Sequence, residues 1–185
     1  MSAVPPAMAG DKTNIILIGM AGSGKSAVGR RLAEMLHLAF VDTDDLIVKA
    51  QGSPLQVILD RLGPAGFRRI EEKILLALDV RGHVIATGGS TVYSAAGMAH
   101  LRNIGLVVLL QVELAILAAR VGSAATRGLV RRPEQTFAQL YAERFPLYRK
   151  YADLVYDCAD QDIESVCRGL IPLLPAITTT RPETS

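Results

Sequence analysis

The stretch that decides the fold reads Gly19-Met20-Ala21-Gly22-Ser23-Gly24-Lys25-Ser26. It matches the pattern of a P-loop, in which Lys and then Ser or Thr follow a glycine-rich turn. The glycines allow successive backbone N–H groups to face one concavity, and a helix that starts there adds the positive end of its dipole. Lys25 can reach the outer phosphates of a nucleotide, and Ser26 can ligate Mg²⁺. The stretch therefore predicts a nucleotide-binding site.

The residues on both sides of this loop support the assignment. Residues 15–18 are an uninterrupted aliphatic run, which is typical of a strand buried on both faces of a parallel sheet. Behind the loop, apolar residues recur at helical spacing over 27–36. A glycine loop that only turned the chain would not need Lys and Ser at its end. We therefore expect a strand, a phosphate-binding loop and a helix in succession.

Length and composition predict one α/β domain. The chain has 185 residues, of which 50% are hydrophobic, and it contains no Trp, as expected for a parallel sheet covered by aliphatic helices. We predict a single P-loop kinase domain over 13–176, with a parallel sheet of about five strands, helices on both faces and a mobile lid at about 122–133. The ends, 1–12 and 177–185, are expected to be flexible tails.

Charge and cysteine content exclude several classes of partner. The chain has 20 Lys and Arg against 18 Asp and Glu, and a net charge of +2 predicts neither nucleic-acid nor membrane binding. No apolar run approaches a membrane span, and the N-terminus lacks a signal-peptide pattern. Cys158 and Cys167 have no metal-site or disulfide spacing, so we expect buried or bystander thiols in a reducing compartment. We expect a cytoplasmic monomer.

The rest of the chain alternates strand and helix patterns. The other strands are predicted at 38–41, 83–87, 106–110 and 154–156, and helices at 27–36, from about 46 to 52, 54–61, from 66 onward, 94–101, 112–121, 137 to about 150, and 163–174. Pro146 is expected to kink or break its helix. Arg68 and Glu72, one helical turn apart, are spaced to form a surface ion pair.

Polar groups follow the predicted strands where ligands bind in an open α/β sheet. Asp42-Thr43-Asp44-Asp45 follows the second strand, and Gly88-Gly89 follows the third, where the backbone can approach an anion closely. The segment 122–133 is basic and rich in small residues, which is typical of a lid over a polyphosphate, although a basic surface loop has the same composition. Phosphoryl transfer needs Mg²⁺ ligands, cationic clamps and a carboxylate that orients the acceptor, and each has a candidate here.

Taken together, these motifs resemble the shikimate kinase family. The resemblance covers roughly 14–174 and rests on the P-loop, Asp42-Thr43-Asp44, Phe67-Arg68 with Glu71, Gly88-Gly89, Arg127 and Arg144-Phe145-Pro146-Leu147-Tyr148. It implies a kinase that uses ATP and Mg²⁺ and phosphorylates a small anionic alcohol.

The resemblance also implies roles for individual residues. The residues that would bind the nucleotide are Gly22, Ser23, Gly24, Lys25, Ser26 and Ala27, and Arg120 would pack on adenine. Ser26 and Asp42 would bind Mg²⁺, and the acceptor would be bound by Asp44, Arg68, Gly88, Gly89 and Arg144. The catalytic residues would be Lys25, Asp44 and Arg127. Asp44 would hold the acceptor hydroxyl, Arg68 and Arg144 would bind its carboxylate, and Arg127 would close over the transferring phosphate.

Three positions depart from the family pattern. Ser90 replaces the third glycine of a Gly-Gly-Gly turn, adding a hydroxyl and a Cβ beside the acceptor; Gly128 replaces the proline after the lid arginine; and Pro64 replaces a glutamate. These departures leave the acceptor open. We predict phosphorylation of shikimate to shikimate 3-phosphate, and the alternatives are homoserine, gluconate, or a P-loop NTPase switch that has no acceptor.

Overall fold

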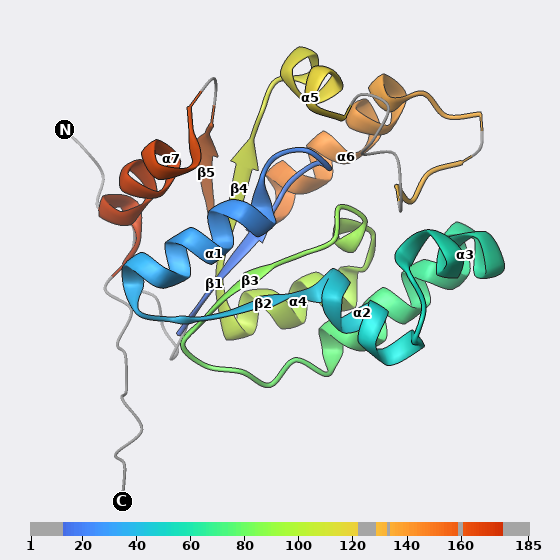
Figure 1. Ribbon diagram of the computed structural model, residues 1–185, viewed down its shortest axis with the longest axis horizontal. Coiled ribbons are helices and arrows are strands. Elements are labelled where there is room, and N and C mark those ends of the chain that lie inside the picture. Colours follow the sequence, from blue (N-terminus) through green and yellow to red (C-terminus); the bar gives the residue numbers. More distant parts are fainter. Residues whose placement is uncertain (1–12, 122–128, 133, 159–160, 176–185) are drawn as a thin grey trace, which may run out of the picture.

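Five parallel strands form a sheet in the order β2-β3-β1-β4-β5 (Figure 1). The computed structural model describes residues 13–121, 129–132, 134–158 and 161–175. The strands are β1 (Asn14–Ile18), β2 (Ala39–Asp42), β3 (His83–Ala86), β4 (Gly105–Gln111) and β5 (Leu154–Asp157). Because all strands run in one direction, the loops that follow them meet at one edge of the sheet.

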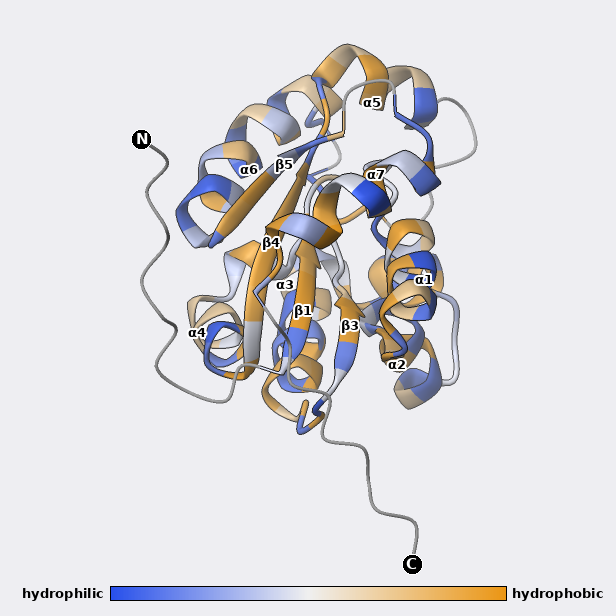
Figure 2. Cartoon of the chain, turned by 90° about the vertical axis from the view of Figure 1, so that its left-hand side faces the viewer, coloured by the Kyte–Doolittle hydropathy of each residue, from blue (hydrophilic) through white to orange (hydrophobic). Residues whose placement is uncertain are grey.

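The central strands form the main core. β1 is buried along its whole length, and Ile16 lies between Ile85 of β3 and Val107 of β4. Figure 2 shows these strands as a hydrophobic centre, with hydrophilic residues on the outer sides of the helices. A strand covered on both faces excludes water from either side, which is why residues 14–18 are almost continuously apolar.

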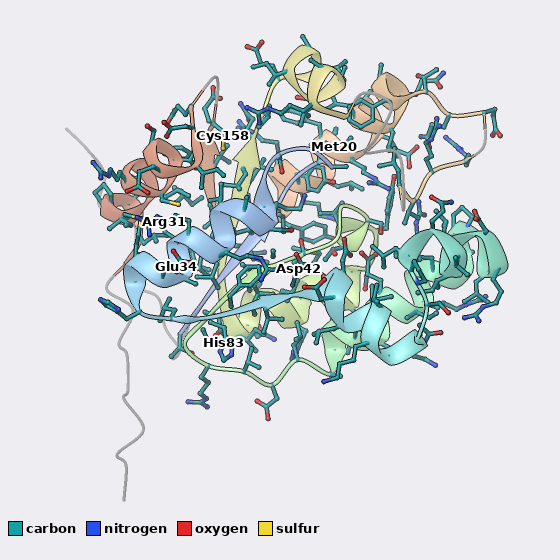
Figure 3. All side chains as sticks on the ribbon, in the orientation of Figure 1. Met20, Arg31, Glu34, Asp42, His83 and Cys158 are labelled. Atoms are coloured by element: carbon teal, nitrogen blue, oxygen red, sulfur yellow. The ribbon has the colours of Figure 1, made fainter. Side chains whose placement is uncertain are left out.

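Helices cover both faces of the sheet. They are α1 (Lys25–Leu36), α2 (Thr43–Gln51), α3 (Leu55–Leu76), α4 (Ala95–Ile104), α5 (Leu114–Val121), α6 (Phe137–Tyr151) and α7 (Ile163–Leu170), with 3₁₀ turns η1 (Thr91–Tyr93) and η2 (Ile171–Leu173). α1 and α7 lie on one face and α4 and α6 on the other (Figure 2). Arg31 of α1 pairs with Glu164 of α7 at 2.7 Å (Arg31 is labelled in Figure 3). The predicted fold class is confirmed.

Several sequence expectations differ in detail from the structure. The helices expected at 54–61 and from 66 onward are one element, α3, kinked at Gly63, where φ is 65°. Such a φ favours glycine, and Pro64 then starts the second part, at a position where its missing N–H costs little. Pro146 lies inside α6 and does not end it, and Arg144 and Tyr148 on either side of it are buried.

Two further expectations about helices were wrong. The last helix ends at Leu170 and passes into η2, whose second residue is a proline. The Arg68–Glu72 ion pair is not formed among the described residues: Glu72 accepts a hydrogen bond from Ser94 Oγ at 2.5 Å. Arg68 instead places its guanidinium over the ring of Tyr93.

A second, smaller group of buried side chains lies apart from the main core. It consists of Ile47, Ile58, Leu59, Phe67 and Val130, and we call it the small core. It joins α2 and α3 to the described segment 129–132, at the side of the molecule away from α7 (Figure 1). No helix in the described ranges is long and apolar enough to cross a bilayer.

Candidate active site

The P-loop lies between β1 and α1, at the edge of the sheet where the strands end. Lys25 starts α1, and its Nζ donates hydrogen bonds of 2.8 Å to the carbonyl oxygens of Gly19 and Met20. Burial lowers the pKa of Lys25 to about 8, and the nearby carboxylates of Asp44 and Asp42 oppose this shift. The lysine therefore keeps its charge at neutral pH in a place where anionic phosphates would be strongly attracted.

Ser26 and Asp42 bring two oxygen ligands together. Ser26 Oγ donates a 2.6 Å hydrogen bond to Asp42 Oδ2, and Asp42 Oδ1 caps α2 by accepting from the backbone of Asp44 at 3.0 Å. Within the described ranges, no group of three or more His, Cys, Asp or Glu is arranged to hold a metal ion. One carboxylate and one hydroxyl are nevertheless what Mg²⁺ uses when nucleotide phosphates supply further ligands, so the residues fit this ion.

Asp44 lies on the first turn of α2 and faces the pocket. Burial raises the pKa of its carboxyl to about 6, the charge of Asp42 adds to the rise, and Lys25 opposes it. Gly88, at the end of β3, passes close by: a Cβ there would clash with Oε1 of Glu71 and lie 2.8 Å from Oδ1 of Asp44. Only glycine lets the backbone pass between these two carboxylates.

Glu71 is a buried carboxylate, 2% exposed, behind the pocket. Its Oε2 accepts from Ser90 Oγ at 2.6 Å, and its Oε1 accepts from Thr91 Oγ1 at 3.2 Å. Burial raises the pKa of Glu71 to about 7, and the charge of Asp44 adds to the rise. The two hydroxyls act in the opposite direction, because they stabilise the ionised form.

Arg144 comes from α6 and is 1% exposed. It donates to the carbonyl of Val130 and, at 3.4 Å, to the hydroxyl of Tyr93, and its Nη1 lies beside Gly89. The hydroxyl of Tyr148 donates to the carbonyl of Gly89 at 2.6 Å and secures the same turn. The guanidinium is thus held in one orientation at the end of the pocket opposite the P-loop.

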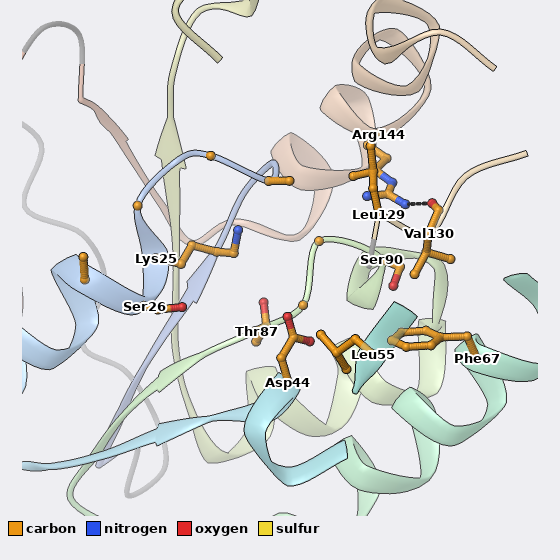
Figure 4. Close-up of a pocket in the computed structure, with 16 residues that line it drawn as sticks. Lys25, Ser26, Asp44, Leu55, Phe67, Thr87, Ser90, Leu129, Val130 and Arg144 are labelled. Atoms are coloured by element: carbon orange, nitrogen blue, oxygen red, sulfur yellow. Dashed lines mark hydrogen bonds between the residues drawn. The ribbon is translucent and has the colours of Figure 1, made fainter. Parts of the chain in front are cut away.

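These groups enclose one pocket of about 400 Å³. Figure 4 shows Lys25 and Ser26 on one side, Phe67, Ser90, Leu129, Val130 and Arg144 on the other, and Asp44 and Thr87 between them. Its size is that of a typical small-molecule site. A phosphate-binding half and an apolar half with one buried cation suit two different ligands.

Most of the predicted site residues meet in this pocket. Gly22, Gly24, Lys25, Ser26, Ala27, Asp44, Gly88, Gly89 and Arg144 line it. Ser23 is buried within the P-loop, with its N–H bonded to Met20 O at 3.1 Å, and Asp42 contacts Ser26. Arg68 is not among the lining residues, and Arg120 is exposed on α5. Arg127 and Gly128, like most of the predicted lid and both predicted tails, lie outside the described residues.

A model of the shikimate kinase family matches residues 21–174. The chain belongs to this family. The shikimate kinase of Caldanaerobacter subterraneus subsp. tengcongensis is 35% identical over 161 residues, which cover 85% of this chain and 94% of that protein. The shikimate kinase of Pseudoalteromonas atlantica is 40% identical over 164 residues, covering 87% and 96%.

A solved shikimate kinase is also similar in structure. The enzyme from Acinetobacter baumannii in complex with shikimate matches with a TM-score of 0.81 and 32% identity, over 87% of this chain and 92% of that chain. The family resemblance predicted from the motifs is confirmed.

Two residues next to the predicted site have no role assigned from the sequence, and two of the departures from the family pattern can be placed. Glu71 belongs to one of the sequence motifs but has no role assigned from it, and Tyr93 belongs to none of them. Ser90 lines the pocket as expected, but its hydroxyl is bonded to Glu71. Pro64, the other departure that is described, does not line the pocket. The one sequence signal that pointed to Glu71 was Ser90, a polar residue in a turn that otherwise follows the glycine pattern of the family.

Proposed function

We propose that the protein transfers the γ-phosphoryl group of ATP to the 3-hydroxyl of shikimate. The observation that carries the proposal is the arrangement of Lys25, Asp44 and Arg144 around one pocket (Figure 4). Lys25 lies at the phosphate end of the pocket, the buried Arg144 lies at the other end, and the carboxylate of Asp44 lies between them. This order suits an acceptor that carries a carboxylate and a hydroxyl, because each group then has a partner of opposite charge or matching polarity.

On the donor side, the P-loop N–H groups and Lys25 bind the phosphates. The Nζ of Lys25 is bonded to the carbonyls of Gly19 and Met20 and is thereby held within the loop. Burial of this ammonium strengthens its attraction for the negative charge that spreads over the transferring group. When Mg²⁺ is bound, Ser26 and Asp42 would hold it, and it supplies further charge neutralisation on the outer phosphates.

On the acceptor side, Asp44 orients the attacking hydroxyl. The hydroxyl oxygen forms a bond to the γ-phosphorus while the bond to the bridging oxygen of ADP breaks, and the hydroxyl proton passes to Asp44. A carboxyl whose pKa is about 6 is mostly ionised at pH 7 and still accepts a proton more readily than an exposed aspartate. Arg144 and, we propose, Arg68 bind the acceptor carboxylate, and the side chains of Leu55 and Phe67 exclude water from one wall.

The roles of Arg120 and Arg127 stay predictions of the family resemblance. Arg120 would pack on adenine from its exposed position on α5, and Arg127 would stabilise the transferring phosphate. Monomeric state and cytoplasmic location also stay predictions. None of them is needed for the acceptor assignment, which the pocket supports without them.

The proposal is tested by measuring ADP release with shikimate, homoserine, gluconate or no acceptor, each at saturating MgATP. We expect turnover with shikimate to exceed the rate without acceptor by at least about 100-fold, since an enclosed kinase site disfavours transfer to water. Phosphorus NMR of the product identifies the 3-phosphate. Preferred turnover of homoserine or gluconate would reassign the acceptor, and equal ADP release in all four samples would favour an NTPase switch.

A further inference from the structure

Tyr93 is in contact with both arginines that the family resemblance assigns to the acceptor carboxylate. Cζ of Arg68 lies 3.6 Å from the centroid of the Tyr93 ring, and Cζ of Arg144 lies 5.2 Å from it. Both distances are within the range of cation–π attraction. One aromatic ring therefore links a guanidinium that lines the pocket with one that does not.

The position of this ring is itself secured. Tyr93 ends the 3₁₀ turn η1, which follows Ser90 directly and is itself followed by the N-cap of α4. Its hydroxyl donates to Oε1 of Glu143 and accepts from Nε of Arg144 at 3.4 Å. Glu143 accepts in addition from Gln135 Nε2 at 2.7 Å and from Arg132 Nη2 at 3.2 Å. The ring cannot turn away from the arginines without breaking these bonds.

Arg68 depends on the ring more than Arg144 does. Its buried Nε has no hydrogen-bond partner among the described residues, and its charge acts on the carboxyl of Glu143, whose pKa it helps to lower. Arg144, in contrast, donates hydrogen bonds to the carbonyl of Val130 and to the hydroxyl of Tyr93. A long side chain with so few bonds keeps most of its rotamer freedom unless a surface holds it, and here the Tyr93 ring is that surface.

We propose that Tyr93 is a positioning residue for the acceptor: its ring aligns Arg68 with Arg144, so that both guanidiniums meet one carboxylate. The inference rests on the proposed function and adds a residue to it. The ring of Tyr93 lies under Arg68 and near Arg144, and its hydroxyl is bonded to Glu143, so Tyr93 acts through the arginines and not by touching shikimate. Its effect is therefore confined to acceptor binding, while the P-loop on the other side is unaffected.

The test compares Tyr93→Leu and Tyr93→Phe with the wild type. Loss of the ring in Tyr93→Leu is expected to raise KM for shikimate by about tenfold, while KM for ATP and kcat at saturating shikimate change less than about threefold. Tyr93→Phe keeps the ring and loses only the hydroxyl, so we expect a rise of about threefold in KM for shikimate alone. This milder variant decides the question if Tyr93→Leu does not fold.

Tyr151→Leu serves as the matched control. It removes a tyrosine ring that lies 5.1 Å from the ammonium of Lys150, on the last turn of α6 and outside the pocket, and it is expected to leave both KM values unchanged. Arg68→Ala adds a coupling test: its effect on KM for shikimate should be smaller in the Tyr93→Leu background than in the wild type, because the ring acts through Arg68.

The outcomes separate this inference from the proposed function. A wild-type protein that does not phosphorylate shikimate overturns the function before any variant is compared. With an active wild type, an unchanged KM for shikimate in the Tyr93 variants, or equal increases in KM for ATP and shikimate, overturns the positioning role. Additive effects of Arg68→Ala and Tyr93→Leu would do the same.

Discussion

Ser90 Oγ donates a 2.6 Å hydrogen bond to Oε2 of Glu71, and both side chains are buried. The serine that replaces a family glycine therefore directs its hydroxyl to a carboxylate of the protein. Glu71 in turn lies against Gly88, across from Asp44. A departure from the family pattern at the acceptor pocket is thus linked to the residue beside the proposed catalytic aspartate.

Replacing Ser90 with Gly is expected to destabilise the fold. The variant leaves a buried carboxylate with one donor fewer, which costs about 1 to 3 kcal/mol. Urea unfolding at pH 7 measures the change. Ser53→Gly is the control for glycine flexibility, because Ser53 makes no hydrogen bond to a described side chain and its loss should cost less than about 1 kcal/mol. Equal losses in the two variants would contradict a specific role of the Ser90–Glu71 bond.

Glu71 should make stability depend on pH. The unfolded chain loses this proton near pH 4.5 and the folded protein retains it up to about pH 7, so its contribution to stability is full below the first value and falls as pH rises to the second. Glu71→Gln removes this fall. We expect wild-type stability to decrease relative to the variant by at most about 3 kcal/mol between about pH 4.5 and 7. If the stabilities of the wild type and of Glu71→Gln changed with pH in parallel, ionisation of Glu71 in the folded protein would cost little free energy.

Asp44→Asn should impair phosphoryl transfer and spare nucleotide binding. Loss of the carboxylate that orients the hydroxyl and takes its proton is expected to lower kcat by about 100-fold or more, with KM for ATP changed less than about threefold. Asp45→Asn is a matched control, since this neighbouring carboxylate is exposed and pairs with Arg30 at 3.4 Å. Equal loss of ATP binding and transfer in Asp44→Asn would remove Asp44 from the acceptor side.

Asp42→Asn tests the magnesium assignment without disturbing α2. Asparagine caps a helix as well as aspartate does, so the melting temperature should change little. The substitution removes a negative charge from the proposed ion site, and the Mg²⁺ concentration needed for half-maximal activity should rise by about tenfold. An unchanged magnesium requirement in a stably folded variant would place the ion elsewhere.

The predicted site residues that line the pocket belong to short, local motifs. Lys25 and Ser26 follow a glycine loop, Asp44 follows a strand, and both relationships need only the order of the chain and the rule that parallel strands end at one edge. Gly88 was expected to permit a close backbone approach to an anion, and the structure places two carboxylates of the protein against it. The position of Gly88 at the edge of the sheet was predictable from the sequence, whereas its contact with Glu71 depends on how α3 packs.

Glu71 and Tyr93 show what the sequence could not supply. Glu71 lies on a helix among charged neighbours, and only the contact of α3 with η1 buries it under Ser90 and Thr91. Tyr93 contacts one arginine from α3 and one from α6, so its role exists only after three distant segments meet. For the same reason Arg68, whose binding role was predicted from a motif, is found on a ring behind the pocket.

The small core has a consequence for how specificity can change in this fold. Phe67 and Val130 belong to it and also form the wall of the acceptor half, whereas the P-loop is anchored through Met20 and Val28 in the main core. Substitutions in the small core therefore remodel the space offered to the alcohol and leave the strand ladder and the phosphate cradle as they are. One wall of the acceptor half and the P-loop therefore belong to separately packed groups of side chains, so that wall can change while the packing of the P-loop is kept.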